Sequence, residues 1–183
     1  MKKFILALMF VLGCFSIGLA QSGKKATAQE KKDLFQLISK NDAMIVEGIR
    51  DGGLVAANLA KEMTVKKIDL NKDGQPEYIV VIENGYLCGA HGNCTNRVYR
   101  KTGSEYQQLL AENGEILTLE KTSTNNFRDL RLEGSNTAFE SSGTVYKFDG
   151  KTYKAIECYT VTSDGNGKKG KMKKTLYKCS EDQ

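Results

Sequence analysis

The chain has 183 residues, of which 27% are charged, and a formal net charge of +5. This length suffices for one domain with a hydrophobic core, and the mild positive charge excludes the strongly basic surface of a dedicated nucleic-acid-binding protein. After residue 20, no apolar stretch reaches the roughly 20 residues that a membrane-spanning helix requires. We therefore expect one folded domain with no nucleic-acid partner and no membrane span.

Residues 1–20 have the pattern of a secretory signal peptide. Lys2 and Lys3 precede an apolar run over residues 4–17, and the small residues Gly18 and Ala20 precede the predicted cleavage site. Cleavage after Ala20 would leave a mature chain that starts at residue 21. The pattern predicts a bacterial-type protein that is periplasmic or secreted.

The same segment allows a second interpretation. Its residues 11–14 (VLGC) resemble the lipobox of bacterial lipoproteins, in which Cys14 would carry a lipid anchor. The residues after Cys14 remain apolar up to residue 20, whereas a lipoprotein usually becomes polar soon after its cysteine. Cleavage after residue 20 is therefore favoured over lipidation.

The first part of the mature chain predicts helices. Residues 21–26 are small and polar, and predict a disordered lead-in before a single domain over 27–183. Thr27 followed by Glu30 forms a capping box, which predicts a helix over 28–39. The segment 42–62 predicts two further helical pieces that are separated at Gly52-Gly53, although its short apolar runs also fit a strand.

From residue 63 onward, short apolar runs alternate with turn residues. The pairs Thr102-Gly103, Asn113-Gly114 and Asp149-Gly150 each separate two such runs, and Asn-Gly and Asp-Gly favour tight hairpins because both residues adopt positive φ. About nine short strands joined in this way form an antiparallel meander. The predicted fold is α+β and mainly β, with short N-terminal helices packed on one twisted antiparallel sheet.

Four cysteines follow the predicted signal peptide, which indicates two disulfides in an exported protein. Cys88 and Cys94 lie symmetrically about His91. If the loop over 164–173 closes a hairpin, Cys158 and Cys179 lie directly opposite each other on the last two strands. The spacing therefore predicts the pairs 88–94 and 158–179 among three possible connectivities.

The stretch 69–77 (DLNKDGQPE) is the most informative in the chain. Oxygen-bearing side chains fall at loop positions 1, 3, 5 and 9, and a glycine at position 6 permits a sharp bend. Ca²⁺ prefers six to eight oxygen ligands, to which the backbone carbonyl at position 7 would contribute. The same residues also fit a polar turn without a metal, because Asp, Asn and Gly favour turns.

Between two strands, the pattern D-x-N-x-D-G-x-x-E resembles the calcium loop of the FG-GAP and VCBS repeat families, over about residues 63–110. The resemblance implies that calcium binds at the matching positions, which are Asp69, Asn71, Asp73, Gln75 and Glu77. The proposed ligands include no evident nucleophile or base, so the expected role of the ion is structural.

Other motifs suggest weaker alternatives. His91 is the only histidine, which is too few for a zinc site of the usual kind. The basic run 168–174 could bind an acidic polymer, but is more typical of a solvated hairpin loop. Tyr146, Phe148 and Tyr153 could stack on a ligand, but their alternation favours core packing. Residues 142–146 resemble the S-G-x-x-Y motif of bacterial lysozyme inhibitors.

The combined patterns predict an exported, non-catalytic binding or structural module with one structural calcium loop. Its partner would be an unidentified protein or a cell-surface polymer. A protein-binding inhibitor or adhesin-like protein is the first alternative, and a periplasmic hydrolase is the second. No G-x-S-x-G, Walker A or G-x-G-x-x-G motif is present in the sequence.

Overall fold

The computed structural model describes residues 24–164 and 171–180. Within these ranges the chain has three N-terminal helices and one short helix between strands, namely α1 (Ala28–Asn41), α2 (Ala43–Arg50), α3 (Ala56–Glu62) and α4 (Gly85–Cys88). None of these described helices is long and apolar enough to cross a membrane. The predicted signal peptide, with Cys14, lies outside the described residues.

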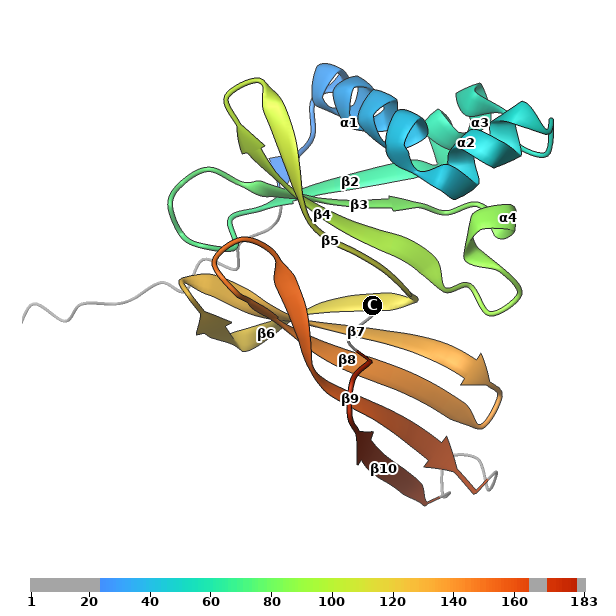
Figure 1. The fold of residues 1–183 in the computed structure, drawn as a ribbon, viewed down its shortest axis with the longest axis vertical. Coiled ribbons are helices and arrows are strands. Elements are labelled where there is room, and N and C mark those ends of the chain that lie inside the picture. Colours follow the sequence, from blue (N-terminus) through green and yellow to red (C-terminus); the bar gives the residue numbers. More distant parts are fainter. Residues whose placement is uncertain (1–23, 165–170, 181–183) are drawn as a thin grey trace, which may run out of the picture.

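The strands form two antiparallel sheets, each in the order of the sequence. Sheet A consists of β1 (Lys24–Lys25), β2 (Met63–Ile68), β3 (Glu77–Ile82), β4 (Cys94–Thr102) and β5 (Glu105–Gly114). Sheet B consists of β6 (Ile116–Thr124), β7 (Phe127–Thr137), β8 (Glu140–Phe148), β9 (Tyr153–Ser163) and β10 (Met172–Tyr177). The helices cover one face of sheet A, and sheet B lies below its other face (Figure 1).

The helical predictions are confirmed. Thr27 accepts a hydrogen bond from the backbone N–H of Glu30, and the Glu30 carboxylate accepts one from the backbone N–H of Thr27, so the capping box is complete. Asp42 ends α1 and caps α2 through a hydrogen bond from the N–H of Ile45. The segment 42–62 forms two helices that are separated at residues 51–55, which include the predicted break.

The meander is confirmed, but the prediction of one sheet is wrong because the strands divide into two. The division falls at Asn113-Gly114, where we expected a hairpin turn. Both residues instead extend β5, and β6 pairs with β7 rather than with β5. A Cβ atom at Gly114 would lie 2.5 Å from the side chain of Leu132, so the glycine allows close approach of the two sheets rather than a turn.

Turns are present at the other two predicted positions, but neither is the expected pair with two positive φ values. Gly103 and Gly150 have φ of +63° and +106°, whereas Thr102 ends β4 and Asp149 has no positive φ. The β6–β7 turn uses Asn125-Asn126, both with positive φ, at a point where the sequence has no Asn-Gly or Asp-Gly pair to indicate it. The predicted disorder of the lead-in is wrong for Lys24–Lys25, which pair with β2. Backbone pairing at a sheet edge does not require apolar side chains, so polarity alone was a poor guide.

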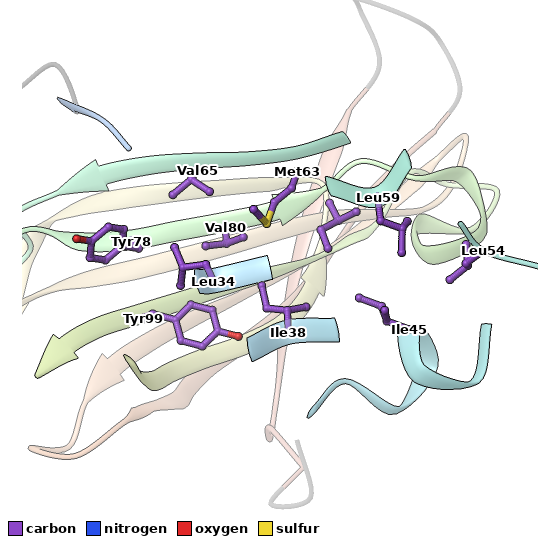
Figure 2. Packing of buried hydrophobic residues seen from close by; sticks show 11 residues of the cluster. Leu34, Ile38, Ile45, Leu54, Leu59, Met63, Val65, Tyr78, Val80 and Tyr99 are labelled. Atoms are coloured by element: carbon purple, nitrogen blue, oxygen red, sulfur yellow. The ribbon is translucent and has the colours of Figure 1, made fainter. Parts of the chain in front are cut away.

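Two hydrophobic cores hold the three layers together. The first lies between the helices and sheet A, where Leu34 and Ile38 of α1 face Val80 of β3 (Figure 2). The second lies between the two sheets and contains Leu70, Val98, Leu109, Leu110, Phe127, Leu130, Leu132, Tyr146, Phe148 and Tyr153. Tyr146, Phe148 and Tyr153 are each at most 5% exposed, which confirms core packing over a ligand-stacking surface.

Both predicted disulfides are present. Cys88 at the end of α4 bonds to Cys94 at the start of β4, with their Cα atoms 4.0 Å apart. Cys158 bonds to Cys179, but the two are not opposite each other as expected: Cys158 lies opposite Tyr177, and Cys179 follows the end of β10. The hairpin is centred one residue earlier than predicted, because β10 already begins at Met172. Two disulfides are typical of a protein in an oxidising, non-cytoplasmic compartment.

Glu30 attaches α1 to sheet A. Its carboxylate accepts hydrogen bonds of 2.7 Å from Lys67 of β2, from the hydroxyl of Tyr78 of β3 and from the N–H of Thr27. Burial opposes ionisation of this side chain, but the hydrogen bonds from Lys67, Thr27 and Tyr78 outweigh it and lower the pKa of Glu30 from 4.5 to about 2. The ionised carboxylate is therefore the form that the folded protein stabilises.

We expect Glu30→Gln to lower the free energy of unfolding by roughly 3 kcal/mol at neutral pH. The lowered pKa means that folding stabilises the ionised carboxylate of Glu30, and the neutral glutamine side chain loses that stabilisation. The contribution of Glu30 is present above pH 4.5 and is lost as the pH falls towards 2. Urea unfolding of both proteins at a series of pH values measures the difference. Glu47→Gln, at an exposed position on α2, is the control. If the free energy of unfolding depends on pH in the same way in both variants, the stabilising role of ionised Glu30 is contradicted.

Candidate functional site

The loop 69–76 joins β2 to β3, whose terminal residues Ile68 and Glu77 are paired. Two residues in the loop adopt positive φ, namely Lys72 at +62° and Gly74 at +85°. These two left-handed residues reverse the chain over a short distance, as the glycine at position 6 led us to expect.

Polar side chains of the loop bind its own backbone. Asp69 Oδ2 accepts a hydrogen bond from the N–H of Gly74 at 3.0 Å. Asn71 Oδ1 accepts from the N–H of Asp73 at 3.1 Å, and Asp73 Oδ1 accepts from the N–H of Gln75 at 2.7 Å. The side chains at positions 1, 3 and 5 therefore stabilise the bend by themselves, which is the arrangement that a polar turn also requires.

Asp69 uses only one of its two oxygens in this way. Its Oδ1 atom is buried and has no hydrogen-bond partner. A buried carboxylate oxygen without a partner loses its hydration without compensation, so a cation or a proton donor at this point would be stabilising. The unpartnered Oδ1 atom is the main structural reason to expect that a metal ion could bind in this loop.

Glu77 closes the loop from the side of β3. Its side chain is 1% exposed, and its Oε2 atom accepts a hydrogen bond from the N–H of Leu70 at 2.8 Å. Desolvation raises the pKa of Glu77 to about 7, and the charges of Asp73 and Asp69 add to the rise, while the hydrogen bond from Leu70 opposes it. Negative charge is therefore unfavourable at this buried position unless a positive group neutralises it.

No lysine or arginine of the described residues forms an ion pair with Asp69, Asp73 or Glu77. Arg100 lies beside the same hollow of about 340 Å³ as Asp73 and Glu77, but its guanidinium donates to Gln107 and lies over the ring of Phe127. The acidic loop thus lacks a direct cationic partner within the described part of the chain.

The structure brings Asp69, Asn71 and Asp73 together in one bend, with Glu77 buried at its end. The side chain of Gln75 is exposed, so only its backbone carbonyl is suited to the predicted role. In the described residues, no three His, Cys, Asp or Glu side chains are already arranged around a point that could hold a metal. Asp73 Oδ2 accepts a hydrogen bond from the side-chain amide of Asn71, so a cation bound here would share this oxygen with that donor or displace it.

The loop lies at the junction of the two sheets. Leu70 is completely buried in the second core, and its carbonyl accepts a hydrogen bond of 2.9 Å from the backbone N–H of Arg128 in β7. This is a link between sheet A and sheet B that the sequence did not indicate. Ordering of the loop would therefore also order the contact between the sheets.

Other predicted residues lie elsewhere. His91 is exposed in the loop that Cys88 and Cys94 close, and Asn93 of this loop bonds to the backbone of Ser135 in β7. A Cβ atom at Gly143 would lie 2.3 Å from the ring of Tyr159, which gives this glycine a packing role. Within the basic run, residues 168–170 lie outside the described residues, and Met172–Lys174 begin β10 instead of a loop.

Sequence reasoning missed the buried ion pair between Arg97 of β4 and Asp42 at the start of α2. The Arg97 side chain is 5% exposed, and it lines a hollow of about 410 Å³ beside α1. Asp42 could have been recognised as a helix cap from its position before Ala43, but no local pattern marks an arginine for burial. A larger hollow, of about 530 Å³, lies between β6 and the face of β2 and β3 that the helices do not cover.

Comparisons of the chain with protein-family models, with curated proteins and with solved structures gave no match. The resemblance to the FG-GAP and VCBS repeats therefore stays a prediction that rests on the loop 69–77.

Proposed function

We propose that this chain is an exported, non-catalytic binding module in which the loop Asp69–Glu77 binds one Ca²⁺ ion with a structural role. The buried, unpartnered Oδ1 atom of Asp69 is the observation that supports the proposal most. The side chains of Asp69, Asn71, Asp73 and Glu77 and the backbone carbonyl of Gln75 would supply the oxygens. The ion would neutralise carboxylates that form no ion pair with any lysine or arginine of the described residues.

The position of the loop supports a structural role. Leu70 anchors the loop in the core between the sheets, and its carbonyl binds the backbone of Arg128. A cation that neutralises the carboxylates would stabilise this junction and, with it, the packing of sheet B on sheet A. Export is supported by the signal-peptide pattern and by the two disulfides.

One observation bears on the alternative of a lysozyme inhibitor. Tyr146, the last residue of the S-G-x-x-Y pattern, is 4% exposed, and Gly143 is covered by Tyr159. A buried tyrosine is poorly suited to insertion into a partner enzyme, so we favour the binding module.

Calcium titrated calorimetrically into chelator-treated protein (residues 21–183) should bind near one equivalent, with a dissociation constant on the order of 10⁻⁴ M. The melting temperature should rise with calcium, because only the folded loop assembles the ligands. Asp73→Ala should abolish binding. Asp73→Asn, which keeps an acceptor for the N–H of Gln75, should weaken it at least about tenfold through the lost charge.

Asp51→Ala is the matched control, since Asp51 is an exposed aspartate outside the loop. It should bind calcium as the unmodified protein does. If millimolar calcium produces neither heat nor a thermal shift, the loop is a polar turn without a metal.

A further inference from the structure

Strand β10 is the terminal strand of sheet B in the described part of the chain. It pairs with β9 along its whole length, from Met172 opposite Ser163 to Tyr177 opposite Cys158. Among the described residues, no strand pairs with its other edge. In Figure 1 the strand lies at the end of the molecule that is farthest from the helices. Its outer row of backbone N–H and C=O groups is thus available for pairing with another chain.

The side chains of β10 contribute little to either core. All six residues are exposed, and Met172, Leu176 and Tyr177 keep 69%, 62% and 49% of their surface accessible. Ile156, two residues before Cys158 on β9, is 58% exposed. Single exposed apolar residues are ordinary, but Met172 and Leu176 share one face of β10 and Tyr177 lies on the other, so both faces beside this edge offer apolar contacts to a partner.

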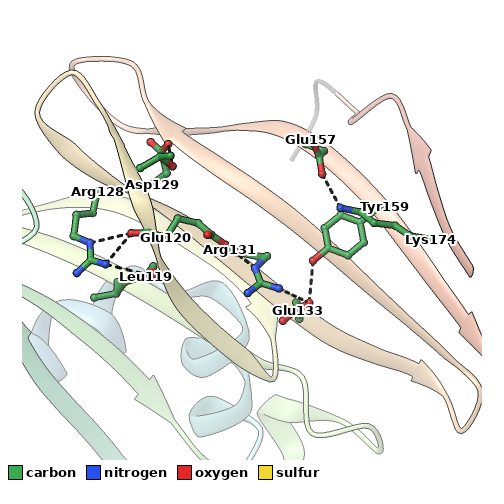
Figure 3. Close-up of polar contacts among 10 residues, drawn as sticks. Leu119, Glu120, Arg128, Asp129, Arg131, Glu133, Glu157, Tyr159 and Lys174 are labelled. Atoms are coloured by element: carbon green, nitrogen blue, oxygen red, sulfur yellow. Dashed lines mark hydrogen bonds and ion pairs between the residues drawn. The ribbon is translucent and has the colours of Figure 1, made fainter. Parts of the chain in front are cut away.

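The chain nevertheless holds this unburied strand in place. The disulfide from Cys158, which is 2% exposed, ties the end of β10 to β9. Lys174 forms an ion pair of 2.9 Å with Glu157, and its Nζ atom lies 3.8 Å from the ring centroid of Tyr159 (Figure 3). These contacts fix the position of the edge without burying it, which reduces the entropy lost when a partner binds there.

The charge of the strand indicates the kind of partner. Lys171, Lys173 and Lys174 lie in or next to β10, and Glu157 offsets only Lys174. A second copy of β10, paired at the usual strand spacing of about 4.8 Å, would bring two such lysine groups together and be repelled. An acidic strand would be attracted. The two faces alternate, with Met172 and Leu176 on one and Lys173 and Tyr177 on the other.

We propose that the free edge of β10 binds an extended, acidic segment of a partner protein, which adds to sheet B as a further strand. Backbone hydrogen bonds would supply affinity, and alternating acidic and apolar side chains would supply specificity. The proposal rests on the proposed role of the chain as a binding module, but it does not depend on calcium in the loop 69–77.

The probe is a capped hexapeptide of alternating glutamate and valine, titrated into isotope-labelled protein (residues 21–183) and followed by NMR. We expect chemical-shift changes at the amides of residues 172–177 and slower hydrogen exchange there. Lys173→Glu should weaken binding roughly five- to tenfold, because an attraction becomes a repulsion. Lys147→Glu, at an exposed position on β8 of the same sheet, should leave it unchanged.

Two further peptides complete the test. A lysine–valine peptide and a glutamate–valine peptide with N-methylated backbone amides should both fail to bind. Four outcomes would overturn the proposal. The N-methylated peptide could bind equally well, or the chemical-shift changes could exclude β10. Alternatively, β10 could pair with a second copy of the chain, or the glutamate–valine peptide could fail to bind. The amide of Gly74 reports calcium binding in the same spectra, so failure at β10 and failure at the loop are read separately.

Discussion

Leu130→Ala should lower the free energy of unfolding by about 2–5 kcal/mol. Leu130 is a completely buried residue of β7, within the core between the two sheets. Truncation removes apolar contacts and leaves a cavity that the strands on either side restrict from closing. Chemical denaturation followed by circular dichroism measures the change.

Ile116→Ala is the matched control on the same sheet, because Ile116 is 54% exposed. We expect it to change stability by no more than about 0.5 kcal/mol.

Leu34→Ala, in the core between helices and sheet A, tests whether the two cores unfold together. If the described layers unfold as one unit, Leu34→Ala and Leu130→Ala each shift a single transition, whereas separate transitions would show that the two cores are independent.

Arg97→Met should destabilise the protein by about 3 kcal/mol. The substitution keeps most of the apolar stem of Arg97 but leaves Asp42, whose side chain is only 22% exposed, without its cationic partner. The effect should fall short of the largest values for buried pairs, because Asp42 retains some contact with solvent. Urea denaturation at neutral pH measures the loss.

Arg50→Met is the control, because Arg50 and Asp51 form an ion pair in which both side chains are 67% exposed. Exposed pairs of this kind contribute about 0–1 kcal/mol. The double variant Asp42→Asn with Arg97→Met should recover part of the stability, since the remaining charge is gone. If the losses of stability in Asp42→Asn and in Arg97→Met add up to the loss in the double variant, the pair does not couple α2 to β4.

Local patterns predicted the helices well. The capping box at Thr27 and Glu30 marked the start of α1, because its hydrogen bonds join residues only three apart. The disulfide between Cys88 and Cys94 was also predictable, since six residues separate the cysteines. The loop Asp69–Glu77 was recognised as a polar bend because its glycine and the spacing of its oxygen-bearing side chains lie within one short segment.

Contacts between distant residues were not predictable in this way. Asn113-Gly114 has the composition of a turn, but the close approach of Leu132 makes Gly114 part of an extended strand. The link from Leu70 to Arg128 arises only when sheet B packs against the loop, and no local pattern marked Glu77 for burial. The same holds for Arg97, whose partner lies 55 residues away along the chain.

The sequence by itself determined the helices, the meander of strands, the pairing of the cysteines and the residues of the acidic loop. Each of these depends on hydrogen bonds, steric preferences or spacing within a short stretch of chain. The tertiary structure decided that the strands form two sheets, that the loop lies at their junction, and that β10 remains an exposed edge. These outcomes depend on which apolar faces cover one another, and that is settled by packing over the whole chain.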